Sequence, residues 1–135
     1  MNRRPRDDGS ATIQAIVIAP VLILLVMVAV ACARIVGMQL DVNASAHAAA
    51  RAASLARTNS TAHTDATAAA TATLADNIHC DQLKSTVDGN LAVGSTVTVT
   101  VTCTVPLADL AYVPWGTYTV TASASAPIDT WRSRL

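Results

Sequence analysis

The chain has 135 residues, which is room for one small domain and one membrane segment. Nine basic residues balance nine acidic ones, so nothing in the charge indicates a nucleic-acid partner. Phe and Glu are absent, whereas alanine and threonine are abundant. Because Ala favours helix and Thr favours strand, the composition predicts an α+β protein. Its small side chains bury little apolar area, so the fold needs support from a disulfide, a membrane or neighbouring subunits.

A basic leader, residues 1–9, precedes an uncharged segment, residues 10–33. The apolar core of this segment, Ile13 to Ala33, would form roughly 31 Å of helix, which matches the thickness of the hydrocarbon layer. Gln14 and Pro20 are its main departures from a purely apolar helix, and the proline should kink its first third. We therefore predict one transmembrane helix, because a buried helix of a soluble protein is rarely apolar on all faces.

The charges beside this segment predict its orientation. Arg3, Arg4 and Arg6 precede it, whereas Arg34 follows it almost alone. The positive-inside rule then places the N-terminus in the cytoplasm and everything after Arg34 outside. A cleaved secretory signal is the rival interpretation, with Ala31-Cys32-Ala33 as its cleavage site. The helical pattern continues past Ala33, which favours the uncleaved anchor.

The next segment, residues 34–57, contains no proline and extends the membrane helix outwards as one rod. One apolar stripe recurs at three- and four-residue steps along it. Its members are Ile35, Met38, Val42, Ala46, Ala49 and Ala53. The alanines permit close approach of another helix, so the stripe packs either against a partner or against this protein's own sheet.

The remaining residues, 58–135, form a small exported head in this interpretation. A second helix is expected from about Ala62 to Asn77, capped by Ser60 or Thr61. It ends before a segment whose periodicity changes from that of a helix to that of a strand.

Strict alternation of apolar and hydroxyl side chains marks two strands, Ser95 to Val105 and Thr117 to Ala126. A shorter strand is expected from Leu83 to Val87, before a turn at Asp88-Gly89-Asn90. The sequence therefore predicts an antiparallel sheet of two or three strands. Only the helices can cover its valine face.

Two cysteines, Cys80 and Cys103, lie in the exported part, where disulfides persist. A bond between them would join the end of the second helix to the sheet. A metal site formed by His79, Cys80 and Cys103 is the alternative, although the spacing does not match known zinc motifs. Cys32 lies inside the apolar segment as a small packing residue.

The sequence has no nucleophile motif, phosphate-binding glycine loop or Glu for acid–base chemistry. We therefore expect no enzymatic activity, no cofactor and no metal. The segment from Leu107 to Gly116 concentrates large apolar residues, including Tyr112 and Trp115, with a turn at Pro114-Trp115-Gly116. It either folds back over the sheet or contacts a partner. An alternative function for the whole protein is a membrane-anchored or secreted binding module of unrelated role, in which Trp115 and its neighbours would bind a ligand or wall component.

The N-terminal third has a more specific layout. A basic leader ends in Gly9, small residues and an apolar run with Pro20 follow, and an Asn-Ala-rich segment from Asn43 leads to Arg51. This resembles the TadE-like proteins, minor pseudopilins of the tight-adherence (Flp, type IVc) pilus machinery. The resemblance implies a pilus-assembly component without catalytic activity, whose partners are the membrane, other pilin-like or pilus-assembly proteins and a prepilin peptidase.

By the same resemblance, the peptidase would cut between Gly9 and Ser10. Gln14 and Pro20 would contribute to assembly and packing within the membrane. Gln14 departs from the family pattern, which places a glutamate there as partner for the new N-terminal amine of a neighbour. Because glutamine offers a hydrogen bond but no charge, leader removal and entry into a filament stay open.

Overall fold

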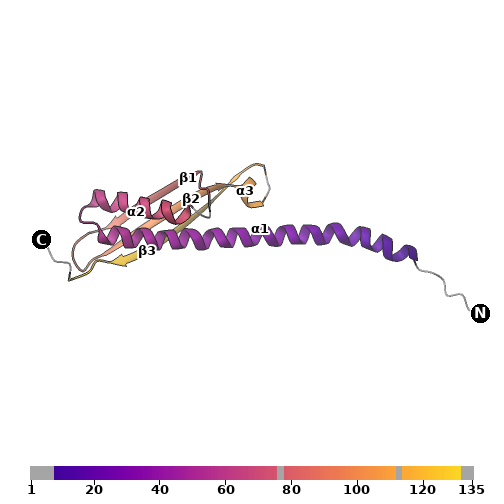
Figure 1. The fold of residues 1–135 in the computed structure, drawn as a ribbon, viewed down its shortest axis with the longest axis horizontal. Coiled ribbons are helices and arrows are strands. Elements are labelled where there is room, and N and C mark those ends of the chain that lie inside the picture. The colour runs from indigo at the N-terminus through magenta and orange to yellow at the C-terminus, as the bar shows by residue number, and fades with distance from the viewer. Residues whose placement is uncertain (1–7, 76–77, 112–113, 132–135) are drawn as a thin grey trace, which may run out of the picture.

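The computed structural model describes residues 8–75, 78–111 and 114–131, and its elements follow the order expected from the sequence. The order is α1 (Asp8–Leu55), α2 (Asn59–Leu74), β1 (Gln82–Gly89), β2 (Thr96–Pro106), α3 (Leu107–Ala111) and β3 (Thr117–Pro127). Figure 1 shows a long rod, α1, with a small α+β head along its C-terminal half. The predicted fold class is confirmed.

Helix α1 contains 48 residues and is therefore about 72 Å long. It continues through Pro20 without a break, and its N-terminal part bends in the view of Figure 1. Proline is tolerated within membrane-spanning helices. The helix has no boundary at Ala33, so the apolar segment and the extension that follows it form a single element.

The sheet has three antiparallel strands in the order β1-β2-β3, so β2 pairs on both sides. The centre of its inner face consists of alternate residues of β2, which are fully or almost fully buried. These residues are Val97, Val99, Val101, Cys103 and Val105. The strands lie within one or two residues of the expected ranges. In β2 and β3 apolar and hydroxyl side chains alternate strictly, and this pattern fits a strand with one buried face.

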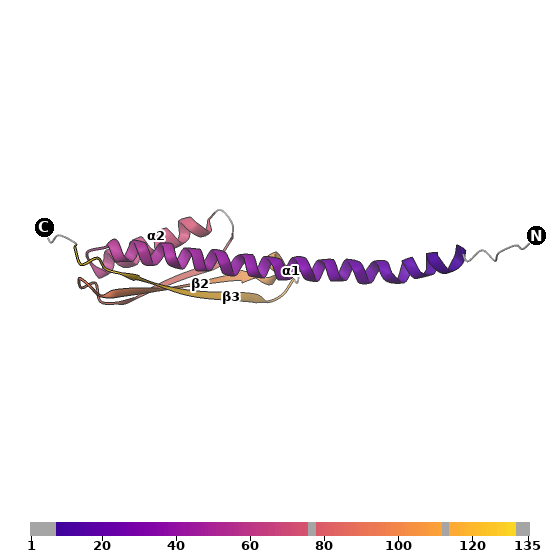
Figure 2. The same cartoon turned by 90° about the horizontal axis from the view of Figure 1, so that it is seen from below.

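Helix α1 covers β2 and β3 of this sheet (Figure 2), and α2 contacts β1. Met38, Val42, Ala46, Ala49 and Ala53 are buried, with 3% exposure or less, and α1 contacts α2, β2 and β3. The apolar stripe thus packs within the head itself, which resolves the alternative left by the sequence. Alanine at these positions lets α1 approach both α2 and the sheet closely.

Helix α2 begins three residues earlier than expected, and its cap is Thr58, not Ser60 or Thr61. The Thr61 backbone N–H donates to Thr58 Oγ1 at 3.2 Å, and the Thr58 backbone N–H donates to Thr61 Oγ1 at 3.2 Å. This is a capping box with threonine in the place usually taken by Glu or Gln. One alanine face of α2 is buried, and Thr67 on another face pairs with Ser85 of β1 at 2.6 Å.

The outer face of the sheet carries rows of hydroxyl groups. Side chains of β2 and β3 that lie opposite each other pair by hydrogen bonds: Thr98 with Ser125 at 2.8 Å, and Thr104 with Thr119 at 3.1 Å. Such cross-strand pairs stabilise an antiparallel sheet modestly. The two faces therefore differ sharply, with a dry valine face toward α1 and a hydroxyl face toward solvent.

The close packing of α1 predicts the effect of enlarging its alanines. Ala49→Leu should lower the free energy of unfolding by about 1–3 kcal/mol, because Ala49 has 0% exposure and no room for a larger side chain. Ala44→Leu, on the exposed side of the same helix, is the matched control and should change stability little. Denaturant unfolding of the full chain in detergent micelles measures both, and equal stability of the two variants would contradict the packing described above.

Candidate functional site

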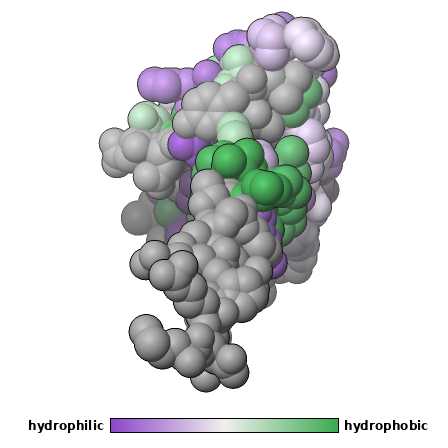
Figure 3. Space-filling view, turned by 90° about the vertical axis from the view of Figure 1, so that its right-hand side faces the viewer, coloured by the Kyte–Doolittle hydropathy of each residue, from purple (hydrophilic) through white to green (hydrophobic). Residues whose placement is uncertain are grey.

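The N-terminal half of α1 presents its apolar side chains to the surroundings. Between Ile13 and Val30 the large apolar residues are 44–68% exposed, although the segment has no charged residue. In Figure 3, seen from the N-terminal end, hydrophobic side chains gather near the centre and more hydrophilic ones lie around and behind them. Among the described residues, α1 is the one helix long and apolar enough to cross a membrane.

The residues singled out for processing and membrane packing lie on this free part of α1. Gln14 and Pro20 are exposed along it, with no contact to the head. Gly9 and Ser10 fall in the first turn of α1, which begins at Asp8. Gly9 and Ser10 therefore lie far from the sheet, and their processing remains a prediction.

The head joins α1 immediately after the uncharged segment. The Arg34 Nη1 atom donates to the backbone oxygen of Asp109 at 3.0 Å, which joins α1 to α3 across 75 positions of sequence. A shallow depression lies at this junction. Its lining comprises Arg34, Gly37, Met38, Asp41, Ile78, His79, Val105 and Asp109. Arg34, the first charged residue after the membrane segment, is therefore an attachment point of the head.

The connection between β2 and β3 differs from the loop that the sequence predicts. It begins with the five-residue helix α3, and the Leu107 N–H donates to the Gly116 oxygen at 2.9 Å, which extends the β2–β3 ladder by one pair. Gly116 has φ 100°, a backbone conformation that favours glycine over residues with a side chain. The chain bends at Pro114 and Trp115, where the sequence predicts a turn.

Trp115 does not cover the sheet. Its side chain is 75% exposed, whereas Leu107 at the other side of the connection is partly buried. Tyr112, the second residue of the expected contact site, lies outside the described residues. Of the two interpretations left by the sequence, folding back over the sheet is therefore wrong for Trp115.

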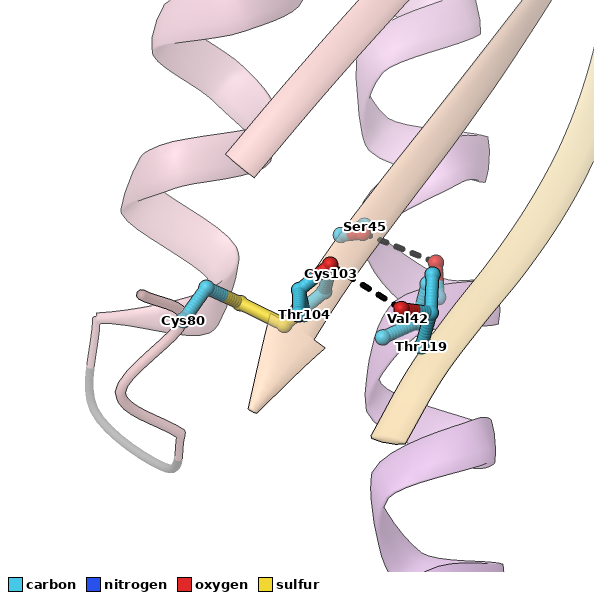
Figure 4. The surroundings of a disulfide bond; sticks show 6 residues. All are labelled: Val42, Ser45, Cys80, Cys103, Thr104 and Thr119. Atoms are coloured by element: carbon cyan, nitrogen blue, oxygen red, sulfur yellow. Dashed lines mark hydrogen bonds between the residues drawn. A yellow bond between two sulfur atoms is a disulfide. The ribbon is translucent and has the colours of Figure 1, made fainter. Parts of the chain in front are cut away.

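A disulfide between Cys80 and Cys103 is present, as predicted (Figure 4). The two Cα atoms are 5.5 Å apart, and the bond joins the segment after α2 to the buried face of β2. Because both sulfur atoms are in the disulfide, neither cysteine is available as a thiolate ligand, and the alternative metal site with His79 does not form. Within the described part of the chain, no cluster of three His, Cys, Asp or Glu residues could hold a metal ion.

Sequence reasoning missed one buried polar residue near this bond. Ser45 has 0% exposure and donates from its hydroxyl to the Val42 backbone oxygen at 2.8 Å (Figure 4). This bond satisfies the hydroxyl within its own helix. Its place on the buried stripe, three residues after Val42, is the signal that could have identified it.

These features define a class: a protein with one apolar membrane helix that continues as the core helix of a small, disulfide-bonded α+β head. Residues 9–51 match the family model described as TadE-like protein. Over these residues the chain is similar to TadE-like proteins, which confirms the resemblance found in the sequence. The match ends within α1, before α2 and the sheet. Comparison with curated proteins and with solved structures gave no match.

The disulfide generates a stability prediction. Cys80→Ala should lower the free energy of unfolding by roughly 3 kcal/mol, because it opens a loop with a sequence separation of 23 residues. Cys32→Ala removes the free cysteine of the membrane segment and should leave stability unchanged. Both can be measured by thermal unfolding of the full chain, with and without reductant. A reductant effect that persists in Cys80→Ala would show that another bond is responsible.

Proposed function

We propose that this protein is a non-enzymatic minor pilin or pilus-assembly component of the tight-adherence type, anchored in the cytoplasmic membrane with its head outside. The observation that carries the proposal is the family match over residues 9–51, which spans the leader junction, the membrane segment and most of the extended helix. Its partners are then other pilin-like or pilus-assembly proteins, and a prepilin peptidase acts at its leader.

The architecture supports this proposal. An assembly component needs a surface that stays available to neighbours within the membrane, and the apolar half of α1 makes no contact that covers it in the isolated chain. The head is compact and carries a disulfide, a bond typical of extracytoplasmic compartments. The excess of arginine before the membrane segment favours the same orientation.

Gln14 defines a specific role for this chain within such a system. A neutral amide can hydrogen-bond across helices in the membrane, where such bonds contribute about 0.6–2 kcal/mol. It cannot neutralise the N-terminal amine of a neighbour in the way a carboxylate does. We therefore place this chain at the base or tip of an assembly, or at its platform, in preference to a repeating position.

Deletion of the gene should abolish pili or reduce them severely in the organism that encodes it, as counted by electron microscopy. The full chain should restore them. A variant that lacks residues 10–33 but is exported through an unrelated signal peptide should not, because it has the head without the membrane surface. Normal piliation in the deletion strain would refute the pilus role.

Leader removal can be tested separately by sequencing the N-terminus of the protein isolated from membranes. The expected start is Ser10, and Gly9→Leu should retain the leader because the bulky side chain would obstruct cleavage there. Gly37→Leu, in the same helix, is the control, since a Cβ at Gly37 meets no atom within 4 Å. Its mature form should again begin at Ser10. A start at Arg34 would instead indicate ordinary secretion.

A further inference from the structure

The position of the β2–β3 connection relative to the membrane segment is fixed by contacts within the chain. Arg34 ends the uncharged stretch, and its guanidinium bonds the backbone of Asp109 in α3 at 3.0 Å. Figure 1 shows α3 at the end of the head that faces the N-terminal half of α1. When residues 10–33 cross a bilayer, α3 and the turn after it lie at the level where the hydrocarbon ends.

The turn at this level carries an exposed large aromatic side chain. Trp115 is 75% exposed, while its backbone is held by the neighbouring bond between Leu107 and Gly116. The indole therefore projects from a fixed support next to Pro114, which is also exposed. Most of the other large hydrophobic residues with high exposure belong to α1 itself, in or near the membrane segment.

The chemistry of indole suits this location. Tryptophan is enriched at membrane–water interfaces, where its apolar ring contacts the upper acyl chains and its N–H bonds headgroups or water. We infer that Trp115 is a membrane anchor of the head, inserted among the headgroups of the outer leaflet. This inference depends on α1 spanning the membrane and not on the pilus role.

A second attachment point would restrain the head. A single helix leaves the head free to rotate about the helix axis and to tilt with it. Contact at Trp115 fixes which side of the head faces the bilayer, because the turn lies on the sheet side of α1 (Figure 2). The hydroxyl face of the sheet and the C-terminal end then stay away from the lipid.

The chain contains its own reference residue. Trp131 is the second of two tryptophans, is 91% exposed, and follows β3 at the opposite end of the head. Strand β3 has 11 residues and spans about 36 Å, so Trp131 lies well beyond the headgroup layer. Single-tryptophan variants therefore report from both ends of one head.

The test uses the full chain reconstituted in phosphatidylcholine–phosphatidylglycerol vesicles, as Trp131→Phe, which retains Trp115, and Trp115→Phe, which retains Trp131. Phospholipids brominated near the headgroup end of the acyl chain should quench Trp115 several-fold more than Trp131. Aqueous iodide should show the reverse order, and the emission of Trp115 should lie to the blue of Trp131. Formation of the Cys80–Cys103 disulfide checks that each variant is folded.

Two outcomes would overturn the inference. The first is iodide quenching of Trp115 equal to that of Trp131 with no effect of brominated lipid, which would leave the indole free for a protein partner. The second is protection of Trp115 that disappears when the protein is diluted to about one copy per vesicle, which would identify a second copy as the contact. Protection that is independent of dilution and sensitive to brominated lipid supports the membrane anchor.

Discussion

The continuity of α1 is the constraint on which the rest of the structure depends. One uninterrupted helix must satisfy two environments, so its sequence changes character along its length. The first half is apolar on every face and suits lipid, whereas the second half has one apolar stripe and suits a protein core. Because no hinge separates the halves, the head is positioned by the membrane segment, and Arg34 marks the point where one environment gives way to the other.

The composition of the head follows from that geometry. The second half of α1 contacts both α2 and the sheet, and alanine fills most of its buried positions. Small residues contribute little burial each, so the core relies on tight packing and on the Cys80–Cys103 bond. The disulfide lies in the half of the head nearer to the apolar part of α1 and joins Cys80 to β2.

Much of this fold could be predicted from the sequence because its periodicities are unusually clear. The alternation of Val and Thr in β2 determines both the strand and its buried face, and the uncharged run determines the membrane helix. The predicted start of α2 was wrong because Thr61 takes the place of the Glu or Gln by which a capping box is usually recognised. Helix α3 was missed because five residues give no periodic signal.

The candidate site was predictable only in part, because local sequence patterns do not encode contacts between distant residues. Residues on α1 could be placed by counting along a helix, so the free position of Gln14 and Pro20 followed from the sequence. The bond between Arg34 and Asp109 spans 75 positions and depends on how the sheet docks on α1, which no local pattern encodes. The exposure of Trp115 likewise depends on that docking, and a hydrophobic side chain in a loop is compatible with either a buried or a surface position.

The rigid passage of α1 from membrane to head makes it a lever. From Arg34 to Leu55 the helix extends about 33 Å beyond the uncharged segment, and β2 and β3 contact this part of the helix. A tilt of about 20° from the bilayer normal, ordinary for membrane helices, displaces the far end of the arm sideways by roughly 11 Å. Small rearrangements among helices inside the bilayer are thereby converted into large displacements of the outer end of the head.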